Sequence, residues 1–108
     1  MTDLLYQHSD NVISVPIVDD VTGEAIPASN FSDAEYIIAT KSGNVRLRLS
    51  LNQGIVIDGS NFKITIDDGA IDKSFRGAMV HQLVVYNQAG DKLPPVFKNN
   101  VKISSVIL

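Results

Sequence analysis

The sequence contains no cysteine and no tryptophan among its 108 residues. Without cysteine, the chain has no disulfide framework, no zinc or iron–sulfur site built on thiolates, and no thiol nucleophile. It also lacks a basic excess, since 9 Lys and Arg stand against 12 Asp and Glu, which gives a formal net charge of −3. Because binding to a phosphate backbone depends on clustered cations, we expect no nucleic-acid partner.

Long apolar runs are missing as well. No stretch approaches the roughly 20 consecutive apolar residues of a membrane helix, so we expect no membrane insertion. The first residues lack the basic region and the apolar core of a signal peptide, so we expect no secretion through one. The length fits one domain.

What is present is an alternation of apolar and polar residues along most of the chain. From Val45 to Leu51, the apolar side chains occupy every second position, and Arg46, Arg48 and Ser50 fall between them. This period of two is typical of strands. Strands are predicted at residues 11–18, 35–40, 45–51, 55–58, 62–67, 78–86 and 101–108.

Two features refine these strands. Pro16 cannot donate a ladder hydrogen bond, so the strand at 11–18 should lie at a sheet edge or break near this residue. The strands at 35–40 and 78–86 are apolar on both faces, which favours central positions. Turns containing glycine separate the strands about every 8–12 residues, and this spacing indicates an all-β sandwich or barrel.

Two segments fall outside this pattern. Residues 1–10 precede the first predicted strand and form an N-terminal arm, so that the domain proper covers residues 11–108. Residues 67–77 interrupt the strand rhythm and predict a single helical turn, with Asp72 as its N-cap.

Candidates for chemistry are few. His81 lies within an apolar strand, where a hydrogen-bonded core histidine is far more typical than a metal ligand or a general base, and His8 lies in the arm. Asp67, Asp68 and Asp72 do not have the ligand spacing of an EF-hand loop and fit ordinary turn chemistry. We therefore predict no catalytic residue, no metal site and no cofactor.

Charged and apolar surface candidates complete the set. Arg46 and Arg48 are predicted to share one face, which is either solvated or directed to an acidic partner or a phosphate. Two apolar segments read as protein-interaction candidates, namely Leu4, Leu5 and Tyr6 in the arm and Pro94, Pro95, Val96 and Phe97 near the C-terminus. The arm could pack on a neighbouring subunit or on its own domain, and the proline segment could protect a sheet edge or meet a partner. The apolar residues 106–108 are either a buried strand end or docked on a partner.

Three stretches carry a resemblance to a known family. They are a strand leading through an Asp-x-x-x-Gly turn to a short polar segment (13–23 and 30–32), a strand and turn (36–45), and a glycine-led strand with its turn and closing strand (77–90 and 101–103). Together they resemble the small immunoglobulin-like β-sandwich domains of tailed phages and prophages, such as the N-terminal domain of baseplate upper proteins. This chain has Met79 and His81 where that family often has tyrosines.

The resemblance implies a single immunoglobulin-like sandwich of about seven antiparallel strands. It further implies a non-enzymatic structural or assembly module of a tail, baseplate or fibre attachment. Such a module would bind protein partners in a virion or an assembly intermediate, a homo-oligomer included, and would be found in the virion or in the host cytoplasm. A carbohydrate- or cell-surface-binding module is the alternative, although 3 Tyr, 4 Phe and no Trp offer little aromatic surface for a sugar.

Overall fold

A computed structural model describes residues 3–6, 10–19, 21–67, 70, 71, 75 and 77–104. These residues form eight strands and one 3-10 turn, η1 (Ala28–Asn30). The strands are β1 (Asp3–Tyr6), β2 (Asn11–Pro16), β3 (Asp33–Ala39), β4 (Val45–Leu51), β5 (Gly54–Asp58), β6 (Asn61–Ile66), β7 (Gly77–Tyr86) and β8 (Phe97–Ser104).

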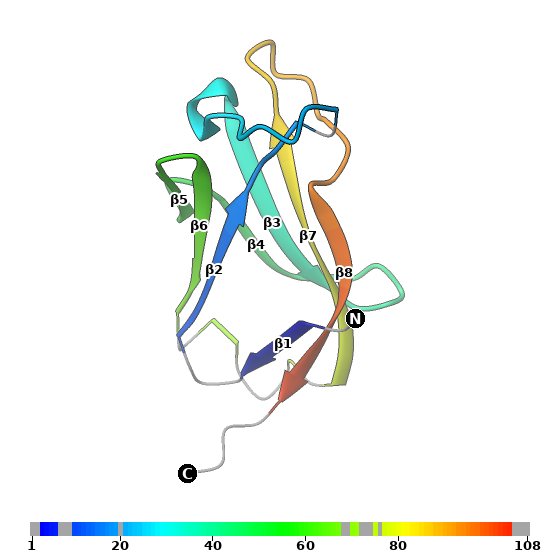
Figure 1. Ribbon diagram of the computed structural model, residues 1–108. Coiled ribbons are helices and arrows are strands. Elements are labelled where there is room, and N and C mark those ends of the chain that lie inside the picture. The colour runs from blue at the N-terminus through cyan, green and yellow to red at the C-terminus, as the bar shows by residue number, and fades with distance from the viewer. Residues whose placement is uncertain are drawn as a thin grey trace.

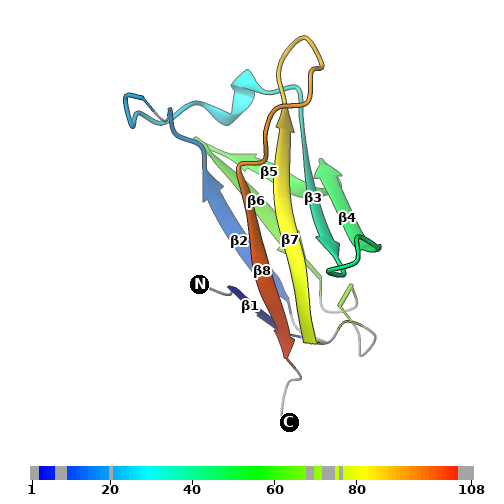
Figure 2. The same cartoon turned by 90° about the vertical axis from the view of Figure 1, so that its right-hand side faces the viewer.

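The strands are hydrogen-bonded in the order β1-β8-β7-β3-β4-β5-β6-β2. In space they form two layers, with β2, β6 and β5 in one and β4, β3, β7, β8 and β1 in the other (Figures 1 and 2). The layers are joined where Ser50 and Leu51 of β4 pair with Gly54 and Ile55 of β5. The chain crosses between layers from β2 to β3 and again from β6 to β7, which is the Greek-key connectivity of immunoglobulin domains. The protein is therefore an all-β, immunoglobulin-like β-sandwich, as predicted.

Apolar side chains at every second position of the strands fill the space between the layers. In β6, Phe62, Ile64 and Ile66 are fully buried, and the intervening Lys63 is exposed. β3 contributes Tyr36 and Ile38 to the same core, both fully buried. Since each strand presents every second side chain inward, the apolar residues of these two strands meet in one core.

The position of Pro16 agrees with its chemistry. β2 is the last strand in the sheet order. No strand pairs with its outer edge, so the missing N–H of Pro16 is tolerated in this strand. β3 and β7 are central, as their apolar character on both faces predicted. Glycines stand at positive φ in the turns at Gly23, Gly43, Gly54, Gly59 and Gly90.

The prediction of about seven antiparallel strands needs two corrections. Residues 3–6, predicted to precede the first strand, form β1, which pairs in parallel with β8. The contact between β4 and β5 is also parallel. The final strand begins at Phe97, earlier than predicted, and residues 105–108 lie outside the described part of the chain.

β4 departs from its predicted single apolar face. Leu47 of β4 pairs with Ile38 of β3, and Val45 pairs with the following residue of β3, Ala39. Arg46, between these two pairs, is therefore the extra residue of a β-bulge. The extra residue shifts Val45 out of phase with Leu47, and Val45 is 47% exposed. Arg46 and Arg48 are separated by the same bulge.

Candidate functional site

His81 is a titratable group buried within the sandwich. It occupies an inward position of β7 between Met79 and Leu83, and it is only 3% exposed. Its Nδ1 lies 2.9 Å from the Tyr36 hydroxyl, and its Nε2 lies 2.7 Å from Asp3 Oδ2. Among the described residues, no buried side-chain polar atom lacks a hydrogen-bond partner. The predicted hydrogen-bonded core histidine is what the structure contains.

The three groups form one hydrogen-bonded chain. If Nε2–H donates to the Asp3 carboxylate, Nδ1 is left as the acceptor for the Tyr36 hydroxyl. In this tautomer both ring nitrogens and the Tyr36 hydroxyl have hydrogen-bond partners. Asp3 also accepts a hydrogen bond from Asn99 Nδ2 at 3.3 Å. The hydrogen bond from His81 is the largest influence that lowers the pKa of Asp3, and burial raises the pKa of Tyr36.

The order carboxylate, imidazole and hydroxyl matches that of a catalytic triad, but here a substrate could not reach the hydroxyl. Tyr36 is fully buried, and the raised pKa of its hydroxyl disfavours the phenolate. The Phe97 ring packs against His81 with ring centroids 4.9 Å apart. The hydrogen bonds of His81 therefore hold Asp3 of β1 against β7, and the hydroxyl in this network is not an exposed nucleophile. Among the described residues, no three His, Asp or Glu side chains are grouped to hold a metal ion.

The N-terminal candidates lie in β1. Leu5 is 4% exposed and belongs to the core of its own chain, whereas Tyr6 is 43% exposed. The Asn11 side chain forms two hydrogen bonds with the backbone of this strand. Its Oδ1 accepts one from Tyr6 N, and its Nδ2 donates the other to Tyr6 O. Leu4 lies in β1, but its side chain is outside the described part, as are His8, Asp68 and Asp72.

The proline segment continues along β7. Leu93 N donates to Val85 O, and Val96 N donates to Leu83 O. Pro94 and Pro95 occupy the two positions between these donors, where neither has an N–H to satisfy. The segment therefore covers part of β7 without leaving unpaired donors.

This segment also forms one wall of a groove at one end of the sandwich. Pro94, Pro95 and Val96 face Ile17 and Val18, which follow β2, and the volume of the groove is about 590 Å³. All of its described lining residues have apolar side chains. Phe97 is turned elsewhere, because its ring is half-buried against His81 and Tyr36. The structure thus brings three of the four C-terminal candidates to one groove and places the fourth beside the histidine.

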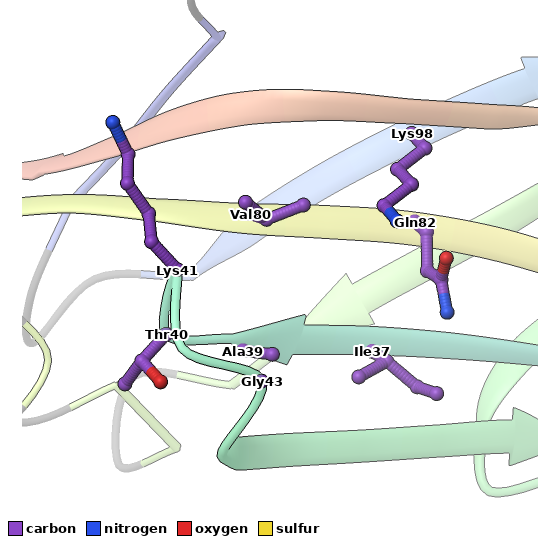
Figure 3. Close-up of a pocket in the computed structure, with 8 residues that line it drawn as sticks. All are labelled: Ile37, Ala39, Thr40, Lys41, Gly43, Val80, Gln82 and Lys98. Atoms are coloured by element: carbon purple, nitrogen blue, oxygen red, sulfur yellow. The ribbon is translucent and has the colours of Figure 1, made fainter.

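A second hollow lies on the outer face of the five-stranded layer. Val80, Ala39 and Ile37 form its floor, with Lys41 at one end and Lys98 and Gln82 at the other (Figure 3). Sequence reasoning missed this site, because the lysines stand 57 positions apart and only the sheet brings them together. The available signal was the apolar character of β3 and β7 on their outer as well as their inner faces.

The two arginines have separate environments. Arg48 lies 3.5 Å from Glu35 in an ion pair on the outer face. The guanidinium of Arg46 lies over the Phe75 ring, 5.5 Å from its centroid. The predicted shared face for these two residues is therefore wrong, because the bulge in β4 directs them to different neighbours.

In the described part of the chain, no helix has the length and apolar character to span a bilayer. No protein-family model matches the sequence, and no curated protein matches it. Among solved structures, the chain is similar to the fibronectin(III)-like modules of Clostridium thermocellum CbhA. The alignment covers 99% of this chain and 93% of that one, at 7% sequence identity and a TM-score of 0.49.

Proposed function

We propose that this protein is a non-enzymatic module that acts by binding other proteins. The observation that carries the proposal is the apolar groove between residues 17–18 and residues 93–96. Apolar concavities of this kind are common places for partner binding, since burying them removes hydrocarbon from water.

The wall of the groove suits this role. Pro94 and Pro95 restrict the backbone, and the hydrogen bonds of Leu93 and Val96 to β7 fix both ends of the segment. A wall that is already ordered loses little conformational entropy on binding. Val18 is 53% exposed beside it and offers further apolar surface.

The narrower proposal is a structural or assembly role in a tailed phage or prophage particle, as a tail, baseplate or fibre-attachment component. Its support is the resemblance of residues 13–23, 36–45, 77–90 and 101–103 to small phage sandwich domains. A module of this kind needs surfaces for protein partners and no catalytic group. The inaccessible Tyr36 hydroxyl is consistent with that need.

The test is co-purification from the strain that carries the gene, after induction of its prophages. Tagged full-length protein should recover tail or baseplate proteins and should sediment with particles. Val96→Asp should abolish recovery, because it places a charge in the apolar groove. Val56→Asp is the matched control, since Val56 is 47% exposed on β5 and does not line the groove.

Two results would count against the proposal at different levels. Recovery that survives Val96→Asp, in a variant that melts like the wild type, would remove the groove from binding. Absence of the protein from particles and from assembly intermediates, together with neighbouring genes unrelated to phage tails, would remove the phage role and leave the binding module.

A further inference from the structure

The outer face of the five-stranded layer carries a row of side chains across four strands. Lys98 of β8 pairs with Gln82 of β7, Gln82 with Ile37 of β3, and Ile37 with Arg48 of β4. Because directly paired residues point to the same side of a sheet, these four side chains share the outer face. A cationic residue therefore stands at each end of the row, with the two backbones about 14 Å apart at a strand spacing of about 4.8 Å.

The next row supplies an apolar floor. Val80 pairs with Ala39, and together with Ile37 they line a hollow of about 240 Å³. Ile37 is only 8% exposed although it points away from the core between the layers. The floor is thus recessed below the long side chains around it, and its volume suits a single side chain of a partner.

The turn from β3 to β4 raises one end of the hollow. Thr40 N donates to Asn44 O, Gly43 N donates to Thr40 O, and Asn44 N donates to the Thr40 hydroxyl. This hydrogen-bonded turn holds the backbone of Lys41 above the floor. Figure 3 shows the Lys41 side chain at this end and Lys98 at the other.

The charge around this hollow is opposite in sign to the net charge of the chain. The hollow is lined by Lys41 and Lys98 and by no carboxylate, while the formal net charge of the protein is −3. Among the described residues, neither lysine forms an ion pair, whereas Arg48 at the end of the row is paired with Glu35. Two exposed ammonium groups beside an apolar floor are complementary to an apolar side chain between carboxylates.

We propose that this hollow binds an acidic segment of a partner protein, with one apolar side chain on Ile37, Ala39 and Val80 and carboxylates at Lys41 and Lys98. A nucleic-acid backbone fits less well, because its phosphates would leave the apolar floor uncovered. The site is separate from the groove at residues 93–96 and does not depend on the function proposed for that groove.

The test is a titration of the full-length protein, labelled with nitrogen-15, with a capped peptide of alternating Glu and Leu. Amide resonances of Ile37, Val80, Gln82 and Lys41 should shift and saturate. A matched peptide of alternating Gln and Leu should bind about tenfold more weakly, and binding should weaken as salt screens the ammonium groups.

Charge reversal locates the site. The double variant Lys41→Glu with Lys98→Glu should weaken binding at least about tenfold, since it places like charges against the peptide. The double variant Lys63→Glu with Lys92→Glu changes the net charge equally at residues outside the hollow and should bind like the wild type. Val96→Asp should also bind normally, which separates this inference from the groove.

Three outcomes would overturn the inference. They are the absence of saturable shifts, shifts that map to another face, and equal loss in both double variants. Tighter binding of a ten-residue thymidine oligonucleotide to the same amides would replace the acidic protein segment with a nucleic acid.

Discussion

His81 Nε2 lies 2.7 Å from Asp3 Oδ2, a contact between residues 78 positions apart in the chain. Its other ring nitrogen, Nδ1, lies 2.9 Å from the Tyr36 hydroxyl. The imidazole therefore joins β1, β7 and β3 through two hydrogen bonds inside the sandwich. A polar group at 3% exposure is tolerated there because both of its nitrogens have partners.

The first prediction concerns the loss of this imidazole. His81→Leu should lower the free energy of unfolding by about 1–3 kcal/mol, because leucine leaves the buried Tyr36 hydroxyl without its acceptor and removes the hydrogen bond to Asp3. Urea denaturation followed by circular dichroism measures the change. Lys102→Gln, at an exposed position of β8, is the control and should stay within about 0.5 kcal/mol. Equal stability of the two variants would show that the network does not stabilise the fold.

The second prediction concerns pH. Hydrogen bonding to His81 lowers the pKa of Asp3 below its usual 3.8 in the folded protein. A carboxyl group with a lowered folded pKa stabilises the protein above its unfolded pKa and loses that effect as pH falls through the folded pKa. The stability difference between the wild type and Asp3→Asn should therefore shrink as the pH falls from about 5 towards about 2.

The control for this pH effect is the same pair in a His81→Leu background, where the side chain at position 81 has no donor. There the main cause of the lowered pKa is absent, so the stability difference should vary less with pH. Because the Asp3 side chain is 43% exposed, solvent weakens the effect, and the comparison of slopes matters more than their size. A pH-independent difference in the wild-type background would contradict the assignment.

The sequence predicted most of the sandwich because its strands carry local signals. Phe62, Ile64 and Ile66 alternate with polar residues, and all three are fully buried. Pro16 is also a local signal, because its missing N–H restricts its strand to the edge of a sheet.

The misses have a common physical cause, namely pairing that no local pattern encodes. β1 has only four residues, and its partner strand begins more than ninety positions later, from Asp3 to Val101 in the register. The bulge that exposes Val45 depends on how β4 meets β3. The histidine network needs Tyr36 and Asp3 from other strands, so the sequence could indicate only that a buried histidine requires partners.

The third prediction tests whether β1 is part of the domain. Leu5→Ala should cost about 2–4 kcal/mol of unfolding free energy, because Leu5 is 4% exposed within the core. Tyr6→Ala is the neighbouring control, and with a side chain 43% exposed it should cost much less. The midpoint for wild type should not change with protein concentration if the strand packs within its own chain. A concentration-dependent midpoint, or a Leu5→Ala cost no larger than that of Tyr6→Ala, would instead place the strand on a neighbouring copy.

The last prediction concerns the junction between the two layers. Gly54 begins β5 at φ +100°, opposite Ser50 of β4, and an added Cβ would lie 2.8 Å from Leu49 Cδ2. Gly43 has nearly the same φ, +99°, but an added Cβ there would meet nothing within 4 Å. Both substitutions by alanine incur backbone strain, roughly 1–2 kcal/mol for a residue with positive φ.

Only Gly54→Ala adds a steric conflict, so it should be the more destabilising of the two by about 1–3 kcal/mol in urea denaturation. The conflict is with a side chain, which allows a direct check through Leu49→Ala. In that background the clash is gone, so Gly54→Ala should cost about as much as Gly43→Ala, and the two single effects should not add. Additive costs for Gly54→Ala and Leu49→Ala would mean that backbone strain alone, and not the approach of Leu49, requires glycine at this junction.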